Sequence, residues 1–364
     1  MHVEDKTDAL PALADRQNEP VGIAVVGAGY WGPNLARNSI QSPATRLVAV
    51  CDADLGRATK LAASLGGVNG TDELQELLDD PEVEAIAVAT PAATHLAVAM
   101  AAIEAGKHVL VEKPLASSYS EGRALVNAAR DHDVVLMCDH TYCYTPAVQR
   151  IRELVHAGVL GDLQFVDSVR INLGLVQRDI NVLWDLAPHD LSILDYILPQ
   201  GCMPMAVAAH GADPIGAGQA CVAYLTLQLP GGAIAHVNVN WLSPIKVRTT
   251  TIGGSKRTLV WDDLNPSQRI SVYDRGVDLA DPDNLNPDDR RQAIVSYRSG
   301  DMVAPALPER EALQGVMAEF AECIHSGRTS RTDGLAGLRV LDILEAASRS
   351  LEFHGSVVPL RGDR

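Results

Sequence analysis

The feature that most constrains this chain is a short apolar run that leads directly into closely spaced glycines. Residues 21–26 read VGIAVV, GAGYWG follows, and the next segment, PNLARNSI, has the composition of a helix. Gly27, Gly29 and Gly32 therefore form G-x-G-x-x-G between a strand and a helix. In such a turn the first glycine permits the tight bend, the second lets a pyrophosphate approach the backbone, and the third allows the helix to pack closely on the strand. The pattern predicts a dinucleotide-binding unit.

A second apolar run supplies the residue that distinguishes between dinucleotides. This run, RLVAVCD, ends at Asp52, twenty residues after Gly32. An acidic side chain at this place accepts hydrogen bonds from the adenosine ribose hydroxyls and repels a 2′-phosphate. The sequence therefore favours NAD over NADP as cofactor, although Arg57, a few residues later, keeps NADP open as the less favoured alternative.

The rest of the chain divides into two parts with different patterns. Up to residue 140, strand-like and helix-like segments alternate, which predicts a doubly wound parallel sheet. Residues 141–364 contain β-branched and aromatic runs broken by glycine turns, which predict a mostly antiparallel sheet. We therefore expect an α/β chain with a flexible tail (1–20), a Rossmann dinucleotide-binding domain (21–140) and a C-terminal α/β domain (141–364) for substrate binding and oligomerisation.

Charge and composition exclude several classes of partner. The chain has 30 Lys and Arg against 46 Asp and Glu, and its net charge of −16 repels nucleic acid. No run reaches the ~18 consecutive apolar residues of a membrane span, and the first residues lack the apolar stretch of a signal peptide. The six cysteines form no CxxC pair, as is usual for reduced thiols. We expect a cytoplasmic protein with no nucleic-acid or membrane partner.

The stretch WDLAPHDL, residues 184–191, places Asp185 and His189 four residues apart on either side of Pro188. That spacing puts both side chains on one helical face. Asp185 is suited to cap a helix whose first turn tolerates the proline. From these residues alone, three interpretations stay open: a cap beside a core histidine, a pair of metal ligands, and an acid/base histidine oriented by a carboxylate. The metal interpretation is the weakest because no third ligand has a telling spacing, so we expect no metal site.

From residue 21 onward the sequence resembles the Gfo/Idh/MocA family of oxidoreductases. The motifs that carry the resemblance are the glycine turn with Asp52, Ala89-Thr90-Pro91, Glu112-Lys113-Pro114, GVLGDL at 158–163, and Asp185 with His189. The resemblance implies a Rossmann domain that binds NAD, followed by a domain whose large, mostly antiparallel sheet has one open face. In the family this sheet often mediates oligomers, so a homodimer or homotetramer is expected.

The resemblance also implies roles for individual residues. We expect His189 to accept the hydroxyl proton as hydride leaves, Asp185 to orient it, and Lys113 to stabilise the developing negative charge on the substrate oxygen. Pro114 is expected to form a cis bond with Lys113. The expected cofactor contacts are Gly27, Gly29, Tyr30, Trp31, Gly32, Asp52, Thr90, Pro91, His95, Glu112 and Lys113. The expected substrate contacts are Lys113, Tyr144, Arg170, Asn172, Asp185 and His189, with Arg170 and Asn172 on the open face of the sheet.

Finer resemblances indicate a branch that acts on nucleotide sugars. They lie in GYWGPNLARN, VRINLG, NVLWDLAPHDLSIL and WLSPIKVRTTTIGGSKRTLVWDD. We expect NAD-dependent oxidation of a ring hydroxyl, at C3, of a hexose linked to a nucleotide, such as UDP-glucose or UDP-N-acetylglucosamine. Lys246, Arg248, Lys256 and Arg257 are candidates for holding the diphosphate. The alternatives are a 3-ketoreductase working in reverse, an inositol or free-sugar dehydrogenase, and an NAD-binding sensor without turnover. The polar stretch at 278–292 is expected to be a loop or lid.

Overall fold

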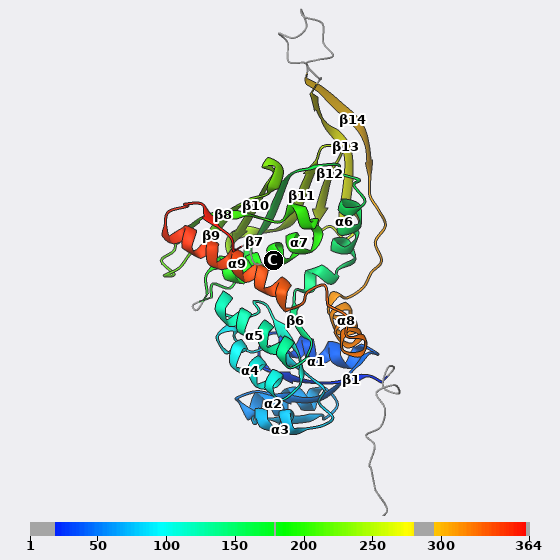
Figure 1. Ribbon diagram of the computed structural model, residues 1–364, viewed down its shortest axis with the longest axis vertical. Helices are drawn as coiled ribbons and strands as arrows, with labels where there is room; N and C mark the ends of the chain where they lie inside the picture. Colours follow the sequence, from blue (N-terminus) through cyan, green and yellow to red (C-terminus); the bar gives the residue numbers. More distant parts are fainter. Residues whose placement is uncertain (1–18, 178–179, 280–294, 362–364) are drawn as a thin grey trace, which may run out of the picture.

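A computed structural model describes residues 19–177, 180–279 and 295–361, which build two sheets joined by helices (Figure 1). Most of the expected N-terminal tail and of the expected polar loop lies outside the described residues. In Figure 1 the smaller sheet and its helices lie below, and the larger sheet lies above, with α7 and α9 between them. The predicted α/β architecture of two sheets is confirmed.

The first sheet is parallel and has the strand order β3-β2-β1-β4-β5-β6. Every residue of β1 and β4 is buried, because helices cover both faces, and this is why these strands read as unbroken apolar runs. The strand order reverses between β1 and β4, where such sheets bind their ligands beyond the carboxyl ends of the strands. The strands are β1 (Val21–Val26), β2 (Thr45–Cys51), β3 (Asn69–Thr71), β4 (Ala85–Val88), β5 (His108–Glu112) and β6 (Leu136–Asp139). The helices are α1 (Gly32–Gln41), α2 (Leu55–Ser64), α3 (Leu74–Asp79), α4 (Ala92–Glu104) and α5 (Tyr119–Asp131).

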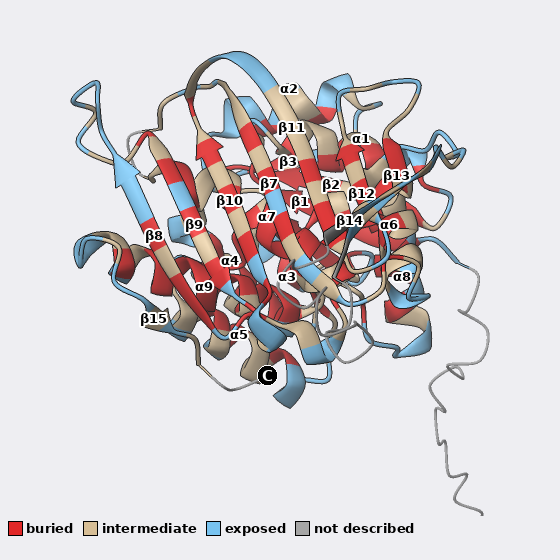
Figure 2. Ribbon diagram, turned by 90° about the horizontal axis from the view of Figure 1, so that it is seen from above, coloured by how far each residue is buried: buried red, intermediate tan, exposed pale blue. Residues whose placement is uncertain are grey.

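The second sheet has the order β14-β13-β12-β11-β7-β10-β9-β8-β15, and its neighbouring strands are antiparallel except for β7 and β10. Along β9 and β10 buried residues alternate with less buried ones, since one face packs on helices and the other is open (Figure 2). Tyr224 and His236 stack on the open face, with ring centroids 6.1 Å apart. The strands are β7 (Leu163–Leu173), β8 (Ala206–Ala212), β9 (Val222–Gln228), β10 (Ile234–Asn240), β11 (Leu242–Gly254), β12 (Thr258–Asp262), β13 (Ile270–Leu279), β14 (Val295–Val303) and β15 (Val358–Pro359).

Helices from the second half of the chain connect the two sheets. A short 3-10 helix, η1 (Thr141–Tyr144), joins β6 to α6 (Pro146–His156). The helix α8 (Ala312–Ser326) packs against the first sheet, where Val316 and Phe320 share a core with β1. The helix α9 (Gly334–Glu352) contacts α5 and β6 as well as α7 (Val182–Ile197) and β8. Residues far apart in the sequence therefore hold the region between the sheets together.

The start of α7 differs from the expectation. Asn181, not Asp185, caps the helix: its side-chain oxygen accepts hydrogen bonds from the N–H groups of Leu183 (3.0 Å) and Trp184 (3.2 Å). Asp185 lies in the first turn, and Pro188 lies inside the helix. The cap prediction was wrong because asparagine caps as well as aspartate does and comes earlier in the chain. The carboxylate of Asp185 is thereby free to contact residues outside its own helix.

The described residues contain neither a helix that could span a membrane nor a cluster of metal ligands. No helix in the described ranges is both long and apolar enough to cross a membrane. Within the same residues, no group of three or more His, Cys, Asp or Glu side chains is arranged to hold a metal ion. The six cysteines are all free thiols.

Candidate active site

The glycine turn between β1 and α1 is shaped for close approach of a phosphate. Gly27 has φ +106°, and a Cβ on it would lie 2.6 Å from the backbone of Ala89. A Cβ on Gly32 would lie 1.9 Å from the carbonyl oxygen of Gly27. Nothing lies within 4 Å of the corresponding position on Gly29. The first and third glycines are thus required by packing, while the second leaves open backbone at the N-terminus of a helix, as a pyrophosphate needs.

Asp52 follows β2 and is held as a carboxylate beside this turn. It accepts hydrogen bonds from the N–H groups of Ala28 (2.7 Å) and Asp54 (2.9 Å), and from the Arg57 guanidinium (2.8 Å). Burial alone would raise the pKa of Asp52, but these hydrogen bonds outweigh it and lower the pKa below its usual value. Arg57 is engaged by this carboxylate, so the cation that would receive a 2′-phosphate is already paired. The arrangement suits the ribose of NAD.

The other expected cofactor contacts border the same end of the sheet. Tyr30 is 88% exposed and meets Trp31 edge-on, with ring centroids 5.8 Å apart. Buried His95 connects two loops, because its ring nitrogens lie 2.8 Å from the carbonyl oxygens of Thr90 and of Pro114. The Thr90 hydroxyl is buried and has no hydrogen-bond partner among the described residues. Pro91 is the N-cap residue of α4. These positions border the region where NAD binds in this fold, and His95 supports its loops.

Lys113 and Asp185 come together from the two domains. The peptide bond between Lys113 and Pro114 is cis, as expected. The Lys113 ammonium donates to the Asp185 carbonyl oxygen (2.9 Å) and lies 3.5 Å from the Asp185 carboxylate. The other carboxylate oxygen of Asp185 accepts a hydrogen bond from Trp241 Nε1 (2.9 Å). Lys113 is only 12% exposed, so its charge acts in a largely enclosed space.

His189 lies one turn after Asp185 on α7, but Asp185 does not hold it. Its Nδ1 is buried and has no hydrogen-bond partner among the residues that the structure describes. The ring instead meets Tyr142 edge-on, with centroids 5.1 Å apart. Burial, followed by the charges of Lys113 and Arg170, lowers the pKa of His189 well below its usual value. The imidazole is therefore neutral near pH 7, the state in which it accepts a proton.

A buried pair of carboxyl groups lies behind Lys113. Glu112 and Asp139 are register partners at the ends of β5 and β6, and their side chains contact each other. Glu112 also accepts a hydrogen bond from the Lys113 N–H (3.1 Å), and Asp139 accepts one from the Thr141 hydroxyl (2.8 Å). Burial raises the pKa of Glu112 and raises that of Asp139 to about 6. Two such close carboxyl groups share one proton. Glu112, the last residue of β5, directly precedes Lys113.

Arg170 and Asn172 are not on the open face of the sheet, and that expectation was wrong. Even-numbered residues of β7 face α7, because Val166, Ser168 and Arg170 are the buried ones. Arg170 forms a two-point ion pair with Asp190 of α7, with distances of 2.7 Å and 3.1 Å. Asn172 is half-buried on the same face. Arg170 is only 3% exposed and is held by this ion pair, so it is a buried partner of α7 and not a residue of the open face.

Tyr144 is also placed differently from the expectation, and its neighbour Tyr142 takes the position near His189. The Tyr144 hydroxyl is buried against Thr332 (2.9 Å), and the guanidinium of Arg331 covers its ring at 4.8 Å. Tyr142, two residues earlier in η1, contacts His189. The sequence CDHTYCYTP contains both tyrosines and no signal that distinguishes them. Tyr142 and Trp241 are therefore the site residues that sequence reasoning missed.

The four cations proposed for a diphosphate do not form one cluster. Arg248 lies on the site side of β11, opposite Arg170, and its guanidinium is 6.0 Å from the Tyr142 ring centre. Lys256 and Arg257 lie in the turn between β11 and β12, next to Arg298 and Asp274. Lys246 is exposed. The four residues do belong to two adjacent strands and their turn, but β11 is long and separates Lys246 and Arg248 from Lys256 and Arg257. Of the four, Arg248 borders the site.

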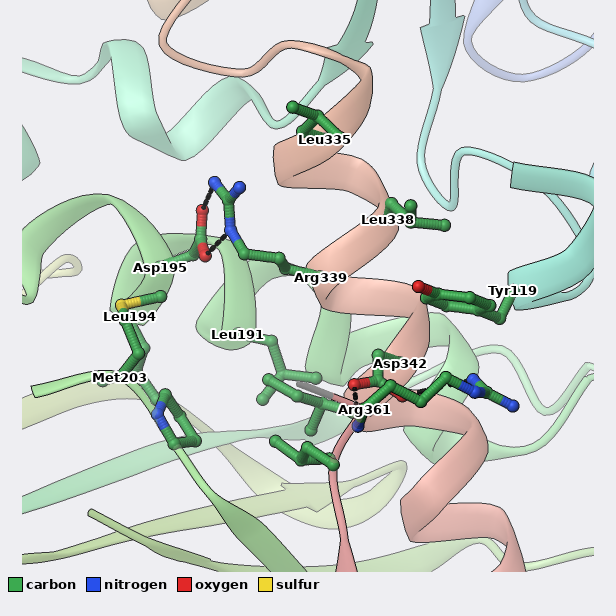
Figure 3. A pocket seen from close by; sticks show the side chains of 13 residues that line it. Tyr119, Leu191, Leu194, Asp195, Met203, Leu335, Leu338, Arg339, Asp342 and Arg361 are labelled. Atoms are coloured by element: carbon green, nitrogen blue, oxygen red, sulfur yellow. Dashed lines mark hydrogen bonds and ion pairs between the residues drawn. The ribbon is translucent and has the colours of Figure 1, made fainter. Parts of the chain in front are cut away.

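A cavity of about 30 Å³ lies between α7, α9 and the C-terminal segment (Figure 3). Leu191 and Leu194 line it, and Arg339 pairs with Asp195 at its rim, with a distance of 2.6 Å. Space of this size holds about one water molecule. No residue from the predicted site lines it, so it is a gap between packed helices and not the catalytic pocket.

Two family models match the chain. Residues 21–140 match the NAD-binding Rossmann fold of an oxidoreductase family, and residues 148–260 match the GFO/IDH/MocA C-terminal domain. UDP-N-acetylglucosamine 3-dehydrogenase of Acidithiobacillus ferrooxidans is 29% identical over 87% of this chain and 93% of its own length. A crystal structure of that enzyme superposes with a TM-score of 0.77, covering 92% of this chain and 98% of the other.

Two other relatives have different names. GenD2 from gentamicin A biosynthesis, solved in complex with NAD, is 27% identical, covers 94% of this chain and 97% of its own, and has a TM-score of 0.77. The NAD-dependent scyllo-inositol 2-dehydrogenase of Bacillus subtilis is 29% identical over 52% of this chain and 57% of its own length. Together with the glycine turn and Asp52, these matches identify an NAD-dependent dehydrogenase that acts on CH–OH groups. The chain belongs to the Gfo/Idh/MocA family of oxidoreductases.

Proposed function

We propose that this protein oxidises the C3 hydroxyl of a nucleotide-linked hexose, such as UDP-glucose or UDP-N-acetylglucosamine, to a 3-keto sugar. One observation carries the proposal. The largely enclosed Lys113 ammonium contacts Asp185, and His189, which is neutral, lies one helical turn after Asp185 on the same helix. The 29% identity to a UDP-N-acetylglucosamine 3-dehydrogenase, over nearly all of both chains, supports the substrate class.

Each of the three residues has a distinct part in the proposed reaction. The glycine turn and Asp52 would hold NAD at the carboxyl ends of the first sheet, and the bound cofactor would supply the hydride acceptor for the carbinol carbon. His189 takes the hydroxyl proton as the carbonyl bond forms, and its lowered pKa keeps it ready to do so at neutral pH. Lys113 donates to the same substrate oxygen and stabilises the charge that develops there.

Asp185 has a different role from the one expected of it. Because its carboxylate lies near Lys113 and accepts from Trp241, we assign it to holding the lysine rather than the histidine. Replacement of Asp185 by Asn is expected to raise KM and lower kcat together, since the ammonium loses one fixed neighbour while its contact to the backbone carbonyl remains.

We assign Arg248 to the anionic part of a nucleotide sugar. It borders Tyr142 and lies 3.5 Å from the Asp263 carboxylate, so a diphosphate or another anion competes with a single loose ion pair. The scyllo-inositol dehydrogenase relative favours a free cyclitol as the second candidate substrate, which carries no anion for Arg248 to bind. Catalysis of the reverse reaction, reduction of a 3-keto sugar, uses the same residues with His189 as the acid.

The open face of the large sheet is the surface that we propose for a homodimer or homotetramer. It carries the Tyr224 and His236 stack, and Ile234 and Leu173 are exposed. Exposed apolar side chains on one sheet face favour association with an identical face.

The test is a substrate panel with a matched variant. Purified protein is mixed with NAD and, separately, with UDP-glucose, UDP-N-acetylglucosamine, dTDP-glucose and myo-inositol, while NADH fluorescence is followed and products are weighed by mass spectrometry. A nucleotide sugar that loses two hydrogens, in a reaction abolished by His189→Ala, supports the proposal. NADH formation with inositol alone would replace the proposal by its alternative. If no compound yields NADH, the protein is denatured and the released NAD is measured. NAD in the denatured sample indicates a retained cofactor, and its absence indicates that the substrate is not in the panel.

A further inference from the structure

We propose that Tyr142 is the positioning residue for His189: its ring holds the imidazole in place and keeps water away from it. This inference rests on the proposed role of His189 as the proton acceptor. Tyr142 belongs to η1, the first element after the Rossmann domain, whereas His189 belongs to α7. The contact between them therefore joins two elements that are separate in the sequence.

Tyr142 is the described side chain in aromatic contact with His189. The two rings meet at 68° with centroids 5.1 Å apart, an edge-to-face arrangement that is favourable for aromatic pairs. Hydrogen bonding does not explain the ring's orientation, because Nδ1 is buried without a partner in the described chain. The carboxylate of Asp185, expected to orient the ring, is bound to Lys113 and Trp241 instead.

The Tyr142 ring is itself held from the other side by a rigid group. The guanidinium of Arg170 lies 4.5 Å from its centre, close enough for a cation–π contact. Arg170 is fixed by its two-point ion pair with Asp190, which also accepts a hydrogen bond from the Ser168 hydroxyl (2.8 Å). This chain of contacts runs from the buried face of the large sheet through Tyr142 to the imidazole.

Two more groups complete the surroundings of Tyr142. Trp261 meets it at 70° with ring centroids 6.2 Å apart, and Arg248 lies 6.0 Å from its centre. The indole N–H of Trp261 is buried without a hydrogen-bond partner in the described chain. The Tyr142 ring therefore lies among another aromatic ring and two guanidinium groups.

The position of Tyr142 has a consequence for the charge state of His189. The charged or titratable groups that act on the imidazole are Lys113, Arg170, His140 and Arg248, with Asp185 one turn away on the same helix. Burial is the largest cause of the lowered pKa of His189, ahead of these cations. Loss of the Tyr142 ring admits water, which weakens both effects, so the pKa of His189 rises toward its usual value.

The experiment compares Tyr142→Met with Tyr142→Phe in the full-length protein. Methionine keeps most of the volume but removes the ring, whereas phenylalanine keeps the ring and removes only the hydroxyl. For Tyr142→Met we expect kcat to fall about 10-fold at pH 7 and the acid limb of the kcat/KM profile to move to higher pH, since activity requires neutral His189. Tyr142→Phe is expected to keep the acid limb of the unmodified protein.

Three outcomes are distinguishable. An acid limb that stays in place in Tyr142→Met, in a variant that still binds NAD and unfolds at the same temperature, would overturn the inference. If Tyr142→Met unfolds early, Tyr142→Leu, which also lacks the ring, takes its place beside Tyr142→Phe. The inference then expects the acid limb to move to higher pH in Tyr142→Leu and to stay in place in Tyr142→Phe, and an unmoved limb in both would overturn it. If His189→Ala itself retains turnover, the proposed function is wrong, whatever Tyr142 does.

Discussion

Asp52, on the cofactor side of the site, is buried, and His189, on the substrate side, is half-buried with a buried Nδ1, and the surroundings of these two titratable groups are opposite. Asp52 is surrounded by hydrogen-bond donors, two backbone N–H groups and Arg57, which favour its charged form. His189 has cations and aromatic rings near it, which favour its neutral form. A group that binds through its charge is thus held by donors, whereas a group that must exchange a proton is left without a hydrogen bond at Nδ1.

The largest expected effect comes from removing the proton acceptor. His189→Asn keeps a similar shape without a base, and we expect kcat to fall about 10³-fold while NAD affinity stays unchanged. Steady-state kinetics and NAD titration by protein fluorescence measure the two sides separately. Weakened NAD binding with normal kcat would instead make His189 a cofactor-binding residue like Asp52.

The next largest effect is expected on stability, from the buried ion pair between Arg170 and Asp190. Asp190→Ala leaves the Arg170 guanidinium buried without its carboxylate, which is expected to lower the free energy of unfolding by about 3 kcal/mol. Urea denaturation checks this value. The matched control is Asp263→Ala, which removes a loose ion pair of 3.5 Å to half-exposed Arg248 and should cost less than about 1 kcal/mol. Equal losses in both variants would show that the buried pair does not support the site.

Lys113→Met tests the electrostatic half of the chemistry. Methionine keeps much of the length of the side chain and removes the charge that stabilises the substrate oxygen, so kcat is expected to fall about 10²-fold. The same change removes one cation that lowers the pKa of His189, and the acid limb of the pH profile should therefore move to higher pH. A fall in kcat with an unmoved limb would separate Lys113 from the histidine.

The smallest effect is expected on the cofactor side. Asp52→Asn keeps an acceptor for the backbone N–H groups but loses the charge, so NAD affinity is expected to fall about 10-fold with little change in kcat. Arg57 then loses the shorter of its two ion pairs, and the preference for NAD over NADP should narrow. Isothermal titration with both dinucleotides measures the ratio, and an unchanged ratio would remove Asp52 from cofactor selection.

The sequence predicted the cofactor side better than the substrate side for a physical reason. The glycine turn and Asp52 are close in the chain, and the third glycine is required by a contact with the first, so local spacing carries much of the geometry. The parallel sheet was likewise readable from its unbroken apolar strands. The prediction of NAD rather than NADP rested on the single carboxylate of Asp52.

The substrate side depends on contacts that local patterns do not encode. Arg170 was assigned to the wrong face because an arginine in a strand usually faces solvent, and its partner Asp190 is twenty residues away on a helix. Tyr142 and Tyr144 lie in one short turn, where the direction of each ring is set by the packing of α7 and α8. Asp185 and His189 were recognised, but their partners Trp241 and Tyr142 come from other elements.

Oxidation at C3 can be tested with UDP-N-acetylglucosamine carrying deuterium at C3. The protein is incubated with this substrate and NAD, and the reduced cofactor is analysed by mass spectrometry. We expect reduced cofactor that carries the deuterium, together with a 3-keto sugar, in a reaction that His189→Asn abolishes. Reduced cofactor without deuterium would place the oxidation at another carbon and contradict the proposed function.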